Sequence, residues 1–126
     1  MRAHLERQAG DLPATFIGFI SDRVELARLL ASADVVLAPG PIETFGLAAL
    51  ESLASGTPVV VSATSALPAV VGDAGVAVVG EDLAGGVRAV LNRPAAERRA
   101  DARRRAEEFN WLSATRGFLD VHESLA

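Results

Sequence analysis

The stretch from Pro39 to Pro58 constrains the fold most, because it contains the signals of a strand end, a loop, a helix and a second strand. The apolar run at residues 34–39 is closed by Pro39 and Gly40, which is typical of a buried strand. A helical pattern starts near residues 44–46, and Gly56 is expected to end it. The β-branched run at residues 58–62 predicts a strand covered on both faces, as in parallel sheets. The stretch therefore predicts one β-loop-α-β unit.

Two carboxylates stand out in this unit, Glu43 in the loop and Glu51 on the helix. A helix rises about 1.5 Å per residue, so Glu51 is expected roughly 8 to 9 Å along the axis from the first turn. Phe45, Gly46 and Leu47 are expected to present backbone N–H groups at the positive end of the helix dipole, which favours anions. A ligand that carries hydroxyls as well as phosphate, such as a sugar nucleotide, fits this combination.

A plainer interpretation stays open for both carboxylates. Glu51 falls outside the predicted core stripe of the helix, so it is equally well explained as a solvated surface residue. Glu43 is equally well explained as a loop charge that the helix dipole favours. The predicted core stripe consists of Leu47, Leu50, Leu53 and Ala54.

The string from Pro39 to Val60 resembles the donor-site signature of a known enzyme family. That family is the retaining glycosyltransferases of the GT-B fold, specifically family 4, also called glycosyl transferases group 1. Glu43 and Glu51 match its Glu-x7-Glu pair. The likeness continues through residues 16–20, 33–39 and 66–75, so it covers most of residues 14–92.

The resemblance implies roles for the matching residues. Glu43 would be the catalytic residue and would hydrogen-bond the donor hexose, while Glu51 would hold the ribose hydroxyls; neither need be a nucleophile. Thr44 and the amides of residues 45–47 would complete the donor site around the sugar and diphosphate. The reaction would transfer a hexosyl group, with retention of configuration, from a nucleotide-diphosphate sugar such as GDP-mannose or a UDP-hexose. No metal and no further cofactor are expected.

The resemblance also suggests where the nucleotide base would lie. Such enzymes usually hold the base at the turn after the strand that matches residues 16–20, which makes Phe19, Ile20 and Ser21 weak candidates; packing is the alternative role for the apolar two. Elsewhere the sequence departs from the family, because Ala69 stands where a Glu commonly follows the proline that matches Pro68. We therefore predict no site role for that loop.

The predicted fold class is α/β, a Rossmann-like three-layer arrangement with a parallel sheet that forms the C-terminal lobe of a GT-B fold, truncated at its N-terminus. Residues 1–93 would form a partial nucleotide-sugar-binding domain, and residues 94–126 would be helices that pack on it or on a missing lobe. In the family, an acceptor-binding lobe and the basic residues that hold the diphosphate precede the residue matching Met1. We expect the donor-binding part of a longer enzyme that acts on an unknown acceptor and is weak or inactive alone. A non-catalytic nucleotide-sugar-binding or interaction module, or a nucleotide-sugar epimerase of the same fold, remains the alternative.

The other elements are predicted from periodicity, caps and breakers. They are a helix at 2–9 ended by Gly10, a strand at 14–20, a helix from Asp22 to about 32, a short helix at 68–71, a strand at 76–79, and a helix at 83–91 with Val87, Val90 and Leu91 facing inward. Asp82 would cap the last of these, although Gly85 and Gly86 weaken it by up to about 1 kcal/mol each.

Pro94 fits the first position of a further, highly charged helix. Its alanines leave little apolar face, which favours a solvated, ion-paired helix over a nucleic-acid-binding arm. The expected four-residue ion pairs are Asp101–Arg105, Arg103–Glu107 and Arg104–Glu108. The final segment could form an apolar side from Trp111, Phe118, Leu119, His122 and Leu125.

Composition narrows the function classes further. The 126 residues fit one domain, and 12 basic against 16 acidic residues argue against a broad nucleic-acid surface. The absence of cysteine excludes disulfides and thiolate metal sites, and His4 and His122, far apart in sequence, are expected to be structural or exposed. The start lacks a signal peptide's apolar segment and no run suits a membrane span, so we expect a cytoplasmic protein, with membrane association through the missing lobe left open.

Overall fold

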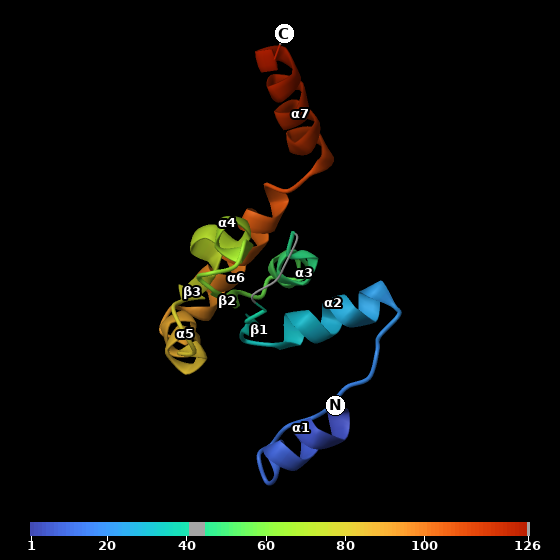
Figure 1. Cartoon of the computed structure of the whole chain (residues 1–126), viewed down its shortest axis with the longest axis vertical. Helices are drawn as coiled ribbons and strands as arrows, with labels where there is room; N and C mark the ends of the chain where they lie inside the picture. The colour runs from blue at the N-terminus through green and yellow to red at the C-terminus, as the bar shows by residue number, and fades with distance from the viewer. Residues whose placement is uncertain (41–44, 126) are drawn as a thin grey trace.

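The computed structural model describes residues 1–40 and 45–125, which form an α/β fold (Figure 1). Two terminal helices, α1 and α7, stand away from the sheet at opposite ends of the molecule. The elements in chain order are α1 (Arg2–Ala9), α2 (Arg23–Ser32), β1 (Val36–Ala38), α3 (Leu47–Ala54), β2 (Val59–Ser62), α4 (Leu67–Val71), the 3-10 turn η1 (Gly72–Ala74), β3 (Val76–Val78), α5 (Leu83–Leu91), α6 (Ala95–Glu107) and α7 (Trp111–Leu125).

The three strands of the described residues form one parallel sheet in the order β1-β2-β3. Val36 pairs with Val59, and Val60 pairs with Val76. The central strand β2 is fully buried over residues 59–61, as its β-branched run predicts. The parallel sheet and the α/β class predicted from the sequence are confirmed.

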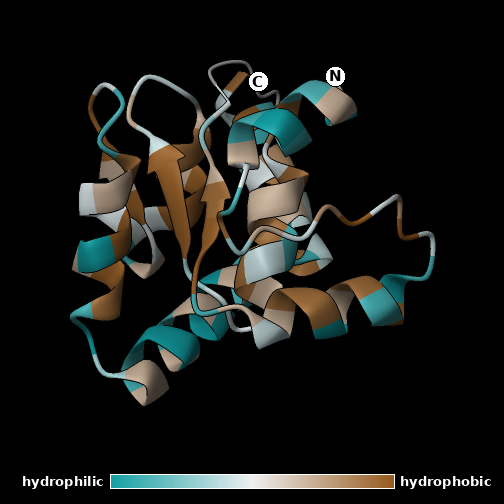
Figure 2. Ribbon diagram, turned by 90° about the horizontal axis from the view of Figure 1, so that it is seen from below, coloured by the Kyte–Doolittle hydropathy of each residue, from teal (hydrophilic) through white to brown (hydrophobic). Residues whose placement is uncertain are grey.

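Alternating side chains of β2 build two core clusters, one on each face of the sheet. Val59 and Val61 point into the larger cluster, which α3, α4 and α6 supply with residues such as Leu53, Leu67 and Ala102. Val60 points the other way, into a cluster with Val78 and Val90 of α5. Figure 2 shows the apolar strands between helices whose outer faces are more polar. The fold therefore has three layers, as expected.

Helix α5 lies unusually close to the sheet because of Gly86. A Cβ at this position would lie 2.6 Å from Cγ1 of Val60 and 2.7 Å from Cγ1 of Val78. Asp82 caps the helix through a 2.9 Å hydrogen bond from the Gly85 amide, as predicted. The inward position predicted for Leu91 is wrong, because its side chain is 45% exposed.

Helix α3 begins and ends where the sequence indicates, and Leu50, Leu53 and Ala54 of the predicted stripe lie in or against the core. Gly46 precedes its first turn, and Gly56 follows its end with a φ of 81°. The buried residues are Ala49, Ser52 and Leu53, while Leu47 is 64% exposed, so the predicted place of Leu47 in the core stripe is wrong. Ser52 is tolerated inside because its hydroxyl donates to the carbonyl of Thr57 at 2.9 Å.

The strand predicted at residues 14–20 is absent from the described structure, where this segment is irregular. Ile17 is 55% exposed and Phe19 is 96% exposed. The guanidinium of Arg2 donates to the carbonyl of Phe16 at 2.8 Å. A strand needs a neighbour to satisfy its backbone, and no described strand lies beside this segment. Strand-like composition alone therefore does not produce a strand here.

Helix α6 is ion-paired, as predicted, but it also packs one face into the core, which the prediction of a solvated helix did not include. Ala102 and Ala106 are 0% and 8% exposed and belong to the larger core cluster, against α3 and α4. Small side chains let the helix approach α3 closely. Pro94 lies just before the first helical residue, one position earlier than predicted.

The ion pairs of α6 match the prediction in one case of three. Arg103 binds Glu107 at 2.9 Å, as expected. Asp101 instead pairs with Arg93 and Arg104, and Arg105 pairs with Glu108. The difference arises because Arg93 reaches Asp101 from outside the helix and because i,i+3 spacing replaces i,i+4.

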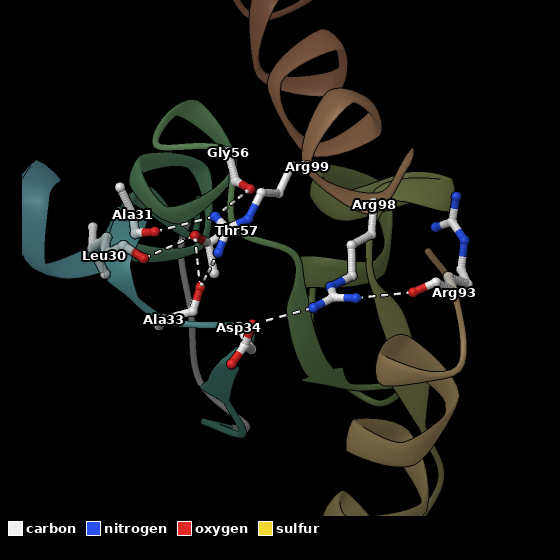
Figure 3. Close-up of polar contacts among 9 residues, drawn as sticks. All are labelled: Leu30, Ala31, Ala33, Asp34, Gly56, Thr57, Arg93, Arg98 and Arg99. Carbon is white, nitrogen blue, oxygen red and sulfur yellow. Dashed lines mark hydrogen bonds and ion pairs between the residues drawn. The ribbon is translucent and has the colours of Figure 1, made fainter. Parts of the chain in front are cut away.

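Two side chains fasten the C-terminal end of α2 to the rest of the fold (Figure 3). The buried hydroxyl of Thr57 donates to the carbonyl of Leu30 at 2.8 Å. Arg99 of α6 donates to the carbonyls of Ala31 at 3.1 Å and Ala33 at 3.0 Å. These bonds satisfy carbonyls that a helix end leaves without partners and fix α2 beside α3 and α6.

Replacing Arg99 by methionine is expected to destabilise the chain by about 1 to 2 kcal/mol, because the carbonyls of Ala31, Ala33 and Gly56 lose a charged donor at a partly exposed site. Urea unfolding followed by circular dichroism measures this change. The matched control is Arg88→Met on the exposed face of α5, for which we expect a change within about 0.5 kcal/mol. Equal midpoints for the two variants would contradict the role of Arg99.

Candidate functional site

The loop that follows β1 leads into α3 at the carboxyl edge of the sheet, where parallel α/β folds bind ligands. Of the predicted site residues, Glu43 and Thr44 lie outside the described residues. Phe45, Gly46 and Leu47 stand at the N-terminal end of α3. Residues 45–47 of the predicted motif therefore lie at this edge of the sheet.

Gly46 is the residue on which the helix start depends. Its φ of 84° and ψ of 45° lie in the left-handed region, and a Cβ would overlap Cδ2 of the fully buried Leu67. The first α-helical bond runs from the Leu50 amide to the Gly46 carbonyl at 3.0 Å, so the amides before Leu50 make no bond of this kind. Glycine has no side chain that could cap these amides, and the N-terminal end of a helix favours anions.

Glu51 has an exposed side chain and lines a hollow of about 320 Å³ between α2 and α3. Arg23, the first residue of α2, lines the same hollow and follows the predicted base-binding turn after one residue, Asp22. In that turn Phe19 and Ser21 are exposed and Ile20 is half-buried. The hollow is lined by Arg23, Leu26, Ala27, Leu30, Glu51, Ala54, Ser55 and Arg103.

Phe45 and Leu47 line a second hollow, of about 550 Å³, on another side of α3. The structure therefore places Glu51 and Arg23 in one hollow and Phe45 in another. Residues after α6 complete the second hollow, among them Phe109 and Trp111. Sequence reasoning missed Phe109 and the two arginines beside Glu51; the aromatic pair around Asn110 was the available signal for Phe109.

Comparison with protein families matches residues 4–109 to a family described as glycosyl transferases group 1. The chain belongs to the glycosyl transferases group 1. The match extends from α1 to just beyond α6, so it includes the whole sheet and the helix α3 that carries Glu51. The family expected from the Glu-x7-Glu motif is thus confirmed.

Individual members of the glycosyl transferases group 1 are also similar to this chain. A GDP-mannose-dependent alpha-(1-6)-phosphatidylinositol dimannoside mannosyltransferase of Mycobacterium tuberculosis is 57% identical over 129 residues, which cover 100% of this chain and 34% of the relative. A glycogen synthase of the same species is 40% identical, over 85% of this chain and 28% of the relative. An MMP alpha-(1->4)-mannosyltransferase of Mycolicibacterium hassiacum is 41% identical, over 79% of this chain and 26% of the relative. The chain spans about a third or less of the length of these relatives.

A third hollow of this group 1 fold, of about 650 Å³, lies where residues 72–76, which lead into β3, face α6. Its charged lining includes the ion-paired side chains of Arg93, Asp101 and Arg104. A hydrogen bond from Arg93, aided by the positive charges of Arg104 and Arg93, lowers the pKa of Asp101 against the opposing effect of burial. Because the folded-state pKa is lowered, this carboxylate stabilises the fold above its unfolded pKa of about 4, and the contribution is lost as pH falls through the folded value.

Within residues 1–40 and 45–125 of this group 1 fold, no three His, Cys, Asp or Glu side chains are arranged to hold a metal ion. None of the helices there has both the length and the apolar content that crossing a bilayer requires. Both histidines, His4 and His122, are exposed.

Proposed function

We propose that this chain is the donor-binding part of a longer, retaining mannosyltransferase that uses GDP-mannose. The observation that carries the proposal is the 57% identity, across the whole chain, to a relative whose name specifies GDP-mannose as donor. A UDP-hexose, the other donor that the motif resemblance implies, is the competing donor class to be tested. The acceptor we propose to test first is a phosphatidylinositol mannoside, from the name of the same relative.

In the proposed pose, the donor contacts α3 at two places, the side chain of Glu51 and the backbone amides of the first turn. Glu51 accepts hydrogen bonds from the ribose hydroxyls in the hollow beside α2, and the base lies towards Phe19, Ile20 and Ser21. The amides that precede Leu50 face the diphosphate, where the helix dipole favours negative charge. Glu43 binds the hexose. Charge-assisted bonds from hydroxyls to these carboxylates are stronger than neutral ones.

We also propose a division of the chain that differs in detail from residues 1–93 and 94–126. Helix α6 belongs to the donor domain, since Ala102 and Ala106 lie in its core. Helix α7 buries none of its residues and exposes Trp111, Phe118 and Leu125. This apolar exposure supports a place for α7 against an acceptor-binding lobe. We further propose that the enzyme works in the cytoplasm and meets its lipid acceptor at a membrane.

The test is calorimetric titration of the complete protein with GDP-mannose, GDP and UDP-glucose. We expect GDP-mannose and GDP to bind, and UDP-glucose to bind at least about tenfold more weakly, because a purine pocket left partly unfilled loses hydrogen bonds. Glu51→Ala is expected to weaken GDP binding by about 10- to 100-fold, as loss of a charged hydrogen-bond partner does. Glu97→Ala, at an exposed position of α6, is the matched control and should bind normally.

Preference for UDP-glucose would contradict the proposal that GDP-mannose is the donor, but it would agree with glycosyl transfer as the activity of the family. Binding without any transfer to phosphatidylinositol mannosides or other acceptors would favour the non-catalytic module instead. Nuclear magnetic resonance of the product's anomeric proton decides retention, because an inverted product would rule it out.

A further inference from the structure

Phe45 connects the donor loop to the rest of the fold. It directly follows residues 41–44, and it directly precedes Gly46, at which α3 begins. Its ring is 48% exposed, so burial alone does not hold it in place. The ring packs edge-on against Phe109, with 6.2 Å between centroids and 82° between ring planes. Aromatic pairs favour this edge-to-face geometry, which gives Phe45 a defined orientation.

Phe109 is in turn held from two sides. The Arg105 guanidinium lies over its ring at 5.0 Å from the centroid, a cation–π contact. The Phe109 amide donates to the carbonyl of Ala106 at 3.0 Å, which extends the end of α6. Since Ala106 is buried in the core, Phe109 has a rigid base.

Arg105 fixes this assembly to α4. Its Nε donates to the carbonyl of Val70 at 2.8 Å, and its Nη2 donates to the carbonyl of Ala69 at 2.6 Å. Arg105 also pairs with Glu108. The same short helix α4 supplies Leu67, whose side chain packs against Gly46. The exit of the donor loop is therefore braced twice, at Gly46 by Leu67 and at Phe45 by Phe109.

We propose that Phe109 is a positioning residue for donor binding, acting through the ring of Phe45 on the loop that carries Glu43. Phe109 lies after α6, 64 positions along the chain from Phe45, and it lines the same hollow as Phe45 and Leu47. The inference rests on the proposed function, because the loop matters for catalysis only if it binds the donor. It predicts that Phe109 and Phe45 act as one unit.

A double-mutant cycle in the complete protein tests this unit. Phe109→Leu and Phe45→Leu, which remove the ring but keep much of the volume, are each expected to lower kcat/KM for GDP-mannose by about three- to tenfold, the range typical of such a ring pair. The double variant should be no worse than the more affected single variant. Phe109→Tyr, which keeps the ring, should retain activity within about twofold. Effects of the two single variants that multiply in the double variant would overturn the proposal.

A second measurement separates positioning from loss of stability and from failure of the proposed function. Hydrogen exchange of the Leu50 amide, which donates to Gly46, should accelerate in Phe109→Leu by about three- to tenfold, the range expected of the lost ring pair. Val90→Ala, in the other core cluster, should lower Tm but leave that amide and kcat/KM unchanged. If exchange of the Leu50 amide accelerates in Phe109→Leu but the protein does not use GDP-mannose, the proposed donor is wrong, and the support of Phe45 by Phe109 is confirmed. If Phe109→Leu lowers Tm but alters neither exchange nor kcat/KM, Phe109 has only a structural role and the inference fails.

Discussion

Replacing Glu43 by alanine in the complete protein is expected to lower kcat for mannosyl transfer by about 100- to 1000-fold, the size of effect seen when a transition-state contact is removed. In the proposed pose this carboxylate binds the donor hexose beside the reacting carbon. A contact that strengthens in the transition state affects kcat more than KM. Steady-state kinetics at saturating GDP-mannose measures the change.

The control for Glu43 is again Glu97→Ala, which should keep the parental kcat. A Glu43→Gln variant keeps the size and hydrogen-bonding capacity of the side chain without its charge, so we expect it to retain more activity than alanine. A Glu43→Ala enzyme with unchanged kcat would remove this residue from the site, whatever the donor proves to be.

Gly46→Ala is expected to destabilise the chain by about 2 to 5 kcal/mol, which sums the left-handed backbone cost and the overpacking cost. The residue has a φ of 84°, and the added methyl group would overlap the side chain of Leu67. Leu67 is fully buried, so it cannot turn into solvent to make room. Thermal unfolding followed by circular dichroism should show a Tm lowered by at least about 8 °C.

Gly80→Ala separates the two costs. Gly80 has a φ of 67°, yet a Cβ there would meet no atom within 4 Å. We therefore expect only the backbone cost, about 1 to 2 kcal/mol. If Gly46→Ala were no more destabilising than Gly80→Ala, the close approach of Leu67 would not constrain the start of α3.

The sequence was sufficient for the central elements because each had several concordant local signals. The strands β1 and β2 combined apolar, β-branched composition with glycine or proline nearby, and α2 had Asp22, whose carboxylate accepts from two backbone amides in the structure. The segment at 14–20 had the composition of a strand but no described neighbour. Pairing is a non-local property, and local composition does not encode it.

The misjudged parts of the site have the same origin. The charge of α6 suggested solvent exposure, but its two buried alanines face α3, and their packing depends on a helix about fifty residues earlier. Helical periodicity placed Leu47 inside, whereas in the first turn of α3 it is Ala49 that lies in the core and Leu47 that is 64% exposed. The contact of Phe109 with Phe45 likewise joins residues far apart in the chain, which no spacing rule connects.

Gly86 has a practical implication for engineering. Exchanging glycine for alanine within helices is a common route to thermostability, since alanine is the better helix former. Here the side chains of Val60 and Val78 occupy the space that a methyl group on residue 86 would need. The exchange would therefore push α5 away from the sheet. In homologues with a larger residue at this position, the helix should lie farther from the sheet. Mutagenesis aimed at greater stability should therefore keep this glycine.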